Sequence, residues 1–212
     1  MLNWSSRHSR ASIDWIIGHL DLQPHQHLLE VGCGPGRLLA AVGSKLNNSF
    51  LAAVEPSITQ YRQATRRNKI LIAHDFLQLH HGQLYDLPYP ASYFHTIYGS
   101  GSYYTFDNLA TECLRLSSLL RAGGRLILLS QPGHYRTEED LRTEAARLQA
   151  AFLKAGLTDI HTEFRDFPSG ACVAVKGSKA IQYIGYQQSN PVNNRLLNST
   201  ASFISKVAGI QQ

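Results

Sequence analysis

Residues 27–39, HLLEVGCGPGRLL, are the stretch from which the fold can be inferred. Leu28, Leu29 and Val31 form the short apolar run typical of a parallel strand that is covered on both faces. Three glycines follow, and helix-forming residues begin at Arg37. Glycine permits positive φ and lets a ligand approach the backbone closely. We therefore expect a strand, a tight turn and a helix N-terminus whose free N–H groups could bind a polar or anionic ligand.

The spacing of these glycines narrows the choice of ligand. A dinucleotide-binding turn has the form G-x-G-x-x-G. This chain has Gly32-x-Gly34-x-Gly36, with Arg37 where the third glycine would be, and it carries Glu30 two residues before the first glycine. The pattern therefore does not predict a dinucleotide as the ligand. A tight strand-to-helix turn without any ligand would leave the same pattern, so the stretch by itself keeps both readings open.

A second acidic residue lies about 20 residues further on. Residues 50–54 (FLAAV) read as the second strand, which Glu55 follows and Pro56 stops, and Ser57 is placed to cap a helix over residues 58–73. A carboxylate at the tip of the second strand can accept both ribose hydroxyls of a nucleoside. The alternative reading is an acid that merely flanks a helix cap.

Composition points to one globular domain. The chain has 212 residues, of which 43% are hydrophobic and 17% charged, enough for a full core without global disorder. Its three cysteines are far apart and form no C-x-x-C, which indicates neither a disulfide framework nor a zinc knuckle. No apolar run is long enough to cross a bilayer, and the N-terminus does not resemble a signal peptide, so a cytoplasmic location is expected.

The net charge of +5 raises the question of nucleic-acid binding. The basic residues are scattered, and the one local run, Arg62, Arg66, Arg67 and Lys69, has helical spacing. We read it as a solvated helix face. Nucleic acid is therefore not the expected partner.

Alternating strand and helix patterns predict an α/β doubly wound sheet in a single domain. The remaining expected helices are 5–20, capped by Ser9 or Ser12, 36–46, 108–120, capped by Asp107 and stopped by Gly123, and 137–155. The remaining expected strands are 77–80, 96–98, one ending at 130, and an antiparallel pair, 159–164 and 171–175. Residues 1–26 are expected to form an N-terminal helix and lead-in, and 178–212 a flexible polar tail.

Four segments, in this order and spacing, resemble the class I S-adenosylmethionine (SAM) dependent methyltransferases, of the kind grouped as the type 11 methyltransferase domain. They are the E-x-G-x-G-x-G turn, Glu55, residues 82–90 (GQLYDLPYP), similar to G-[DS]-A-x-x-L-P-[FY]-P, and residues 119–128, similar to L-[KR]-P-G-G-R-L before the fifth strand. Gln83 replaces a frequent Asp, Ala122 replaces a proline, and residues 91–95 lack two acids of the family pattern. The match spans about 9–176.

The resemblance implies a Rossmann-like seven-stranded sheet with its last strand antiparallel, a methyltransferase domain over 27–177, and SAM as cofactor. In this family the glycine turn holds the methionine portion, the acid corresponding to Glu30 reaches the amino group, Glu55 takes the ribose, Ile58 covers the adenine, and the residue at Gln83 accepts from the adenine amino group. The candidate cofactor-binding set is Glu30, Gly32, Cys33, Gly34, Gly36, Glu55, Pro56, Ile58, Gln83, Leu84, Gly99 and Ser100. No metal site is expected, because His80 and His81 lack a third ligand at a useful spacing.

The sequence defines the methyl acceptor less closely than it defines the cofactor. The turn after the fourth strand, residues 99–104 (GSGSYY), should border the methyl-transfer site, and Tyr103, Tyr104 or His134 could orient an acceptor or simply line the pocket. A small-molecule acceptor is expected, because no D/N-P-P-Y tetrapeptide follows the fourth strand. Methylation of RNA, DNA or protein, and SAM binding without catalysis, are the alternatives. The sequence indicates no oligomeric state.

Overall fold

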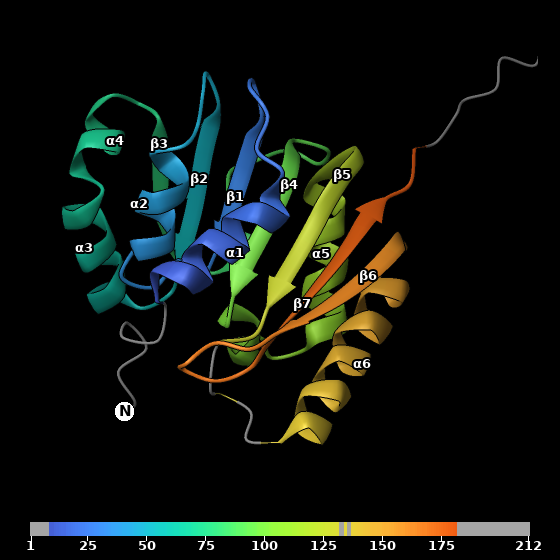
Figure 1. Cartoon of the computed structure of the whole chain (residues 1–212). Coiled ribbons are helices and arrows are strands. Elements are labelled where there is room, and N and C mark those ends of the chain that lie inside the picture. Colours follow the sequence, from blue (N-terminus) through green and yellow to red (C-terminus); the bar gives the residue numbers. More distant parts are fainter. Residues whose placement is uncertain (1–8, 132–133, 135–136, 182–212) are drawn as a thin grey trace, which may run out of the picture. The chain divides into compact units, whose positions relative to one another are not determined.

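The computed structural model describes residues 9–131, 134 and 137–181 (Figure 1). The first residues of the predicted N-terminal helix, 5–8, and residues 182–212 of the predicted tail lie outside this part. Residue 178, the predicted start of the tail, lies in a strand that continues to Lys179.

A seven-stranded sheet with the order β3-β2-β1-β4-β5-β7-β6 forms the centre of the fold. The first five strands are parallel, and β7 runs antiparallel to both β5 and β6. This arrangement confirms the predicted doubly wound sheet and its antiparallel last strand. The strands are β1 His27–Val31, β2 Phe50–Glu55, β3 Leu77–His81, β4 Phe94–Ser100, β5 Leu120–Leu129, β6 Leu157–Arg165 and β7 Cys172–Lys179.

Helices cover both faces of the sheet, and each layer has its own hydrophobic cluster. One cluster joins the sheet to α1, α2 and α3; the other joins it to α5 and α6. Figure 1 shows α1 and α2 in front of the sheet and α5 behind it. This double cover explains why β1 and β2 are almost continuously apolar. The helices are α1 Arg10–Leu20, α2 Arg37–Gly43, α3 Ile58–Arg67, α4 Lys69–Ala73, α5 Leu109–Leu119 and α6 Glu138–Lys154, with 3₁₀ turns η2 Leu84–Asp86 and η3 Ser102–Thr105.

The predicted helix over residues 58–73 is two helices that meet at Asn68. This residue has φ −103° and ψ 18°, outside the helical region. Its Nδ2 atom donates to the carbonyls of Ala64, 2.9 Å away, and Gly36, 3.1 Å away. A contact with a distant turn therefore interrupts a pattern that is locally helical. The sequence alone does not show that contact.

At the two ends of α5 the predicted boundaries are wrong. The cap of α5 is Asn108, whose side chain accepts from the Thr111 N–H, and not Asp107. The helix ends at Leu119, and Gly123, predicted as its stop, lies inside β5 at φ +73°. There residues 121–124 of β5 lie opposite the single β4 residue His95, because Phe94 pairs with Leu120 and Thr96 with Arg125, so β5 starts earlier than the glycines suggest.

Other ends differ by a few residues. The strand β4 continues through Gly99 and Ser100, two residues of the predicted turn, and α2 ends at Gly43 rather than at residue 46. Of the two proposed caps of α1, Ser9 is the one that accepts from a backbone N–H, that of Ser12.

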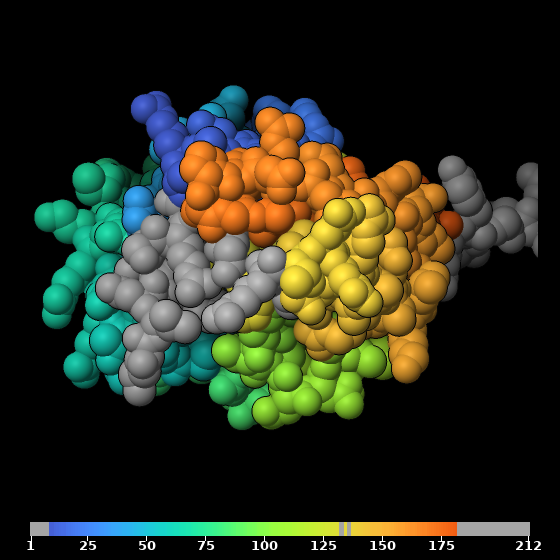
Figure 2. All heavy atoms as spheres, turned by 60° about the horizontal axis from the view of Figure 1, so that its bottom comes forward, coloured from blue at the N-terminus to red at the C-terminus, as the bar shows by residue number. Residues whose placement is uncertain are grey.

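The carboxyl ends of the parallel strands meet at one edge of the sheet, where β1 and β4 are neighbours although β2 and β3 separate them in the chain. The connections from β1 and β4 lead to opposite faces. This is the switch point at which open α/β sheets bind ligands. Figure 2 looks toward this edge and shows α6 (yellow) beside the β6–β7 hairpin (orange).

Candidate active site

The glycine turn, residues 32–36, has the backbone that its composition predicts. Gly32, Gly34 and Gly36 have φ values of +62°, +55° and +74°, in the left-handed region. The N–H of Gly32 donates to the carbonyl of Val54 over 2.8 Å, which joins the turn to the end of β2. Residues with a Cβ would be strained at all three positions. The turn is therefore held in one conformation before any ligand arrives.

Helix α3 fastens the turn from outside. Arg67 donates from Nη1 to the Pro35 carbonyl over 2.7 Å, and Asn68 donates to the Gly36 carbonyl. A Cβ at Gly36 would lie 2.5 Å from Asn68 Nδ2. Both residues were missed as site residues, because nothing in the local sequence reveals their distant partners.

Glu55 links the end of β2 to the turn. Its Oε2 accepts from the Gly34 N–H over 2.8 Å, and its Oε1 accepts from the Ser57 N–H over 2.9 Å. Burial raises the pKa of this carboxyl, and the two backbone N–H groups partly offset that rise. Each carboxylate oxygen has a second lone pair. The group can therefore hold the turn and still accept ribose hydroxyls.

The side chain of Glu30 is buried, and it is not exposed at the surface of the glycine turn. It is 3% exposed, and Tyr98 of β4 donates its hydroxyl to Glu30 Oε2 over 2.9 Å. Burial raises the pKa of Glu30 to about 8, despite the opposing hydrogen bond from Tyr98. Glu30 therefore keeps its proton at neutral pH. Cys33, also buried, has its thiol pKa raised, mainly by burial. Tyr98 is a further residue that the sequence pattern did not single out.

A cleft opens at the carboxyl ends of β1 and β2. Among the candidate cofactor residues it brings together Gly32, Pro56, Gln83 and Leu84. Its full lining is Val31, Gly32, Val54, Pro56, Gly82, Gln83, Leu84, Tyr85, Thr105, Phe106, Asp107 and Glu112. Its volume is about 130 Å³, below the roughly 300–1,000 Å³ of typical ligand pockets. It can therefore hold only part of a nucleoside cofactor.

The other candidate residues lie around this cleft and not in its wall. Ile58 is 44% exposed at the start of α3, where it could cover a bound base. Gly34 and Gly36 belong to the adjoining turn, and Glu55 accepts from the Gly34 N–H. Gly99 and Ser100 are buried at the end of β4.

A second cluster follows β4 and β5. The rings of Tyr104 and His134 stack with centroids 3.9 Å apart and an interplanar angle of 12°. The Gln131 N–H donates to the Tyr104 hydroxyl oxygen over 3.2 Å. Tyr103 is only 1% exposed and packs in the core, with the Arg147 guanidinium 5.8 Å from its ring centre. Two of the three predicted acceptor residues are therefore in contact, and Gln131 joins them.

The arrangement fits a SAM-like cofactor. The rigid glycine cradle accepts a polar chain end, Glu55 offers free lone pairs beside it, and the cleft between Pro56, Gln83 and Leu84 continues from Gly32. SAM supplies an electrophilic methyl group on a sulfonium. The chain's task is to bind it and to align an acceptor.

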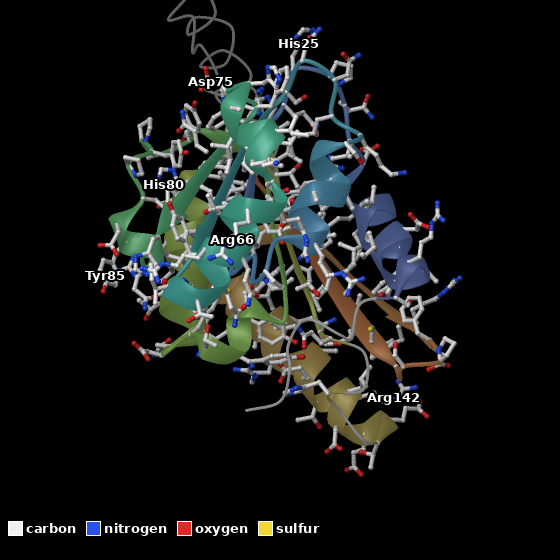
Figure 3. The ribbon with its side chains drawn as sticks, turned by 90° about the vertical axis from the view of Figure 1, so that its left-hand side faces the viewer. His25, Arg66, Asp75, His80, Tyr85 and Arg142 are labelled. Atoms are coloured by element: carbon white, nitrogen blue, oxygen red, sulfur yellow. The ribbon has the colours of Figure 1, made fainter. Side chains whose placement is uncertain are left out.

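Among the described residues no Lys or Arg lines the cleft, although Arg67 binds the adjoining glycine turn. Four arginines pair with carboxylates, namely Arg115, Arg125, Arg142 and Arg147. Figure 3 shows Arg66 on α3 and Arg142 on α6, two separate parts of this side of the molecule. His80 contacts the Tyr89 hydroxyl at 2.8 Å.

Residues 9–131, 134 and 137–181 contain no group of three or more His, Cys, Asp or Glu side chains that could hold a metal ion. Within the same ranges, no helix has the length and apolar character needed to cross a membrane.

Known proteins resemble this chain in sequence. Residues 28–124 match the family model described as a methyltransferase domain. A protein of Bacillus subtilis (strain 168), described as the uncharacterized methyltransferase YdaC, is 23% identical over 166 residues, which cover 78% of this chain and 90% of that protein.

Solved structures show the same fold. The YcgJ protein of B. subtilis has a TM-score of 0.64 at 12% identity, over 82% of this chain and all of that one. Geranyl diphosphate C-methyltransferase from Streptomyces coelicolor A3(2), solved with Mg²⁺, geranyl diphosphate and S-adenosyl-L-homocysteine (SAH), has a TM-score of 0.62 at 16% identity, over 80% and 79% of the two chains. The match over residues 28–124, the related methyltransferase and the fold together support a class I SAM-dependent methyltransferase.

Proposed function

We propose that residues 27–177 transfer a methyl group from SAM to a small-molecule acceptor, with the cofactor held by the glycine turn, Glu55 and the cleft. The observation that carries the proposal is the position of this cleft, which lies beside the β1–β4 switch point and is lined by Gly32, Pro56 and Gln83. The glycines would hold the methionine portion, Glu55 the ribose, and Gln83 and Leu84 the adenine.

The acceptor would bind beside the cluster after β4 and β5. The Tyr104 hydroxyl oxygen accepts the Gln131 N–H, which places this hydroxyl beside the residues that follow β5. The stacked His134 ring would hold Tyr104 in place. Bringing an acceptor atom within about 3–3.5 Å of the methyl carbon accounts for much of the acceleration in such displacements. A general base is needed only if the acceptor loses a proton.

A small acceptor is favoured by the placement of the basic residues. Within the run at 62–69, Arg67 bonds the glycine turn, and Arg115, Arg125, Arg142 and Arg147 are paired. A nucleic-acid site needs several cations that face phosphates together. The similarity of the fold to a geranyl diphosphate methyltransferase is compatible with a small acceptor.

Calorimetric titration with SAM, SAH and NAD is the first test, and we expect SAM and SAH, but not NAD, to bind. Methyl transfer from labelled SAM should then be screened against low-molecular-mass and macromolecular fractions of a cell extract. Label in RNA, together with a steep loss of transfer as salt rises, would contradict the small-molecule acceptor. Binding of NAD without SAM would contradict the proposal as a whole.

A further inference from the structure

The side chain of Ser102 lies at the switch point itself. Ser102 is the first residue of η3, separated from the end of β4 by Gly101 alone, and is 4% exposed. A Cβ on Gly32 would lie 2.5 Å from the Ser102 Cβ, and a Cβ on Gly99 would collide with Ser102 Oγ. The side chain therefore fills a niche between the ends of β1 and β4 that exists only because glycine stands directly after β1, at position 32, and next to the end of β4, at position 99.

The hydroxyl of Ser102 is buried and has no hydrogen-bond partner within the described part of the chain. A buried polar group without a partner is costly, and such groups in folded proteins call for an explanation. The backbone around it is fixed, because Thr105 Oγ1 donates to the Ser102 carbonyl over 2.8 Å. The turn thus fixes the position of the hydroxyl, although no group of the turn forms a hydrogen bond with it.

Gly32 connects this hydroxyl to the cofactor cleft, because it lines the cleft and also packs against Ser102. The cleft is too small for a whole SAM molecule, so the remainder of the cofactor must lie beyond Gly32. Since the turn is expected to hold the methionine portion, Ser102 lies next to that end.

We infer that Ser102 is a cofactor-binding residue, whose hydroxyl hydrogen-bonds the amino-acid end of SAM. This inference rests on the function proposed above and adds to it a contact outside the four segments of the family resemblance. The cofactor would supply the missing partner, and the glycines at 32 and 99 would be required to admit both the serine and the ligand.

Two ligands and two variants test the inference. SAH carries the amino-acid end, whereas 5′-methylthioadenosine shares the adenosine part but lacks that end. Ser102→Ala should weaken SAH binding by about tenfold, the range expected for one hydrogen bond to a polar or charged group, and leave 5′-methylthioadenosine binding unchanged. Without ligand, its melting temperature should stay the same or rise, because an unpartnered buried hydroxyl is removed.

Thr96→Val is the matched control. Thr96 lies on the same strand, is fully buried, and its hydroxyl also lacks a partner among the described residues. It pairs with Leu28 and Arg125 toward the other end of β4. We expect Thr96→Val to leave the affinities for both ligands unchanged.

Three results would count against a role for Ser102 in binding. Unchanged SAH affinity in Ser102→Ala, or an equal loss for SAH and 5′-methylthioadenosine, would overturn the inference while leaving the proposed function intact. A wild-type protein that bound neither ligand would overturn the proposed function, and the inference with it.

Discussion

The glycine turn and the turn after β4 lie at the ends of neighbouring strands, yet they satisfy their polar groups in different ways. In the glycine turn, the N–H of Gly34 and the carbonyls of Pro35 and Gly36 all have partners from β2 or α3. After β4, Ser102 Oγ is buried without a partner among the described residues, as is Nε2 of Gln131, which follows β5 and packs against this turn at Gly101. The first turn is thus a finished cradle, whereas the second keeps polar groups available for ligands.

The largest effect should come from adding a methyl group to the finished cradle. Gly36, Gly101 and Gly156 have nearly the same φ, +74°, +73° and +73°, but different surroundings. A Cβ at Gly36 meets Asn68 and the Ala64 backbone, one at Gly101 meets the Gln131 side chain, and one at Gly156 meets nothing within 4 Å.

Alanine at each position should therefore destabilise in the order Gly36, Gly101, Gly156. Backbone strain accounts for about 1–2 kcal/mol in all three, and overpacking adds about 1–3 kcal/mol where the neighbours cannot move. Chemical denaturation of the three variants measures this order. Equal losses would show that α3 does not confine the turn.

The buried acid beneath the cradle should make stability depend on pH. The pKa of Glu30 is about 8 in the folded chain, against roughly 4.3 in an unfolded one. Below the unfolded value both states are protonated. As the pH rises toward 8, only the unfolded state loses the proton, so folding becomes less favourable, by on the order of 2–4 kcal/mol.

Glu30→Gln should therefore flatten the fall in melting temperature between pH 5 and 8. Glu139→Gln, which changes an exposed acid on α6, should keep the wild-type slope. If the two variants had the same pH dependence, the buried acid would not be its source.

Glu55 should affect both the cradle and its ligand. Glu55→Gln leaves one of the Gly34 and Ser57 N–H groups facing an amide N–H in place of an acceptor. It also removes a charged acceptor for ribose. We expect SAM affinity to fall by about 1.5–3 kcal/mol, roughly ten- to over a hundredfold, with some loss of thermal stability. Calorimetry at a temperature where both proteins are folded measures the first effect, and an unchanged dissociation constant would exclude Glu55 from the cofactor site.

The smallest effect should come from the outer fastening of the turn. Arg67→Ala removes the hydrogen bond to Pro35 and should weaken SAM binding by about 0.5–1 kcal/mol, because Arg67 is exposed and the bond is screened by solvent. Arg66→Ala changes the same charge on the adjacent residue and should have less than about half this effect. If both variants lost a similar amount of SAM affinity, the cause would be the loss of a positive charge near the cofactor and not the loss of the hydrogen bond to Pro35.

Local patterns were sufficient for the parts of the site that lie on contiguous chain. The glycine turn needs positive φ at three positions, and only glycine adopts it without strain. The alternation of buried strands and helices likewise predicted the doubly wound sheet, since parallel strands covered on both faces are apolar throughout. Gly123 was misread because a glycine with positive φ can end a helix or form a bulge, and the choice depends on the pairing with β4.

The sequence by itself determined the strand–turn–helix that forms the cradle, the acid at the tip of β2 and the class of sheet, because each depends on backbone preferences and on periodic burial within one segment. Only the tertiary structure decided which distant side chains complete the site. Asn68, Tyr98 and Ser102 reach it across 32, 68 and 70 positions of the chain from Gly36, Glu30 and Gly32. Such contacts follow from strand order and helix packing, which place residues side by side regardless of their separation in the chain.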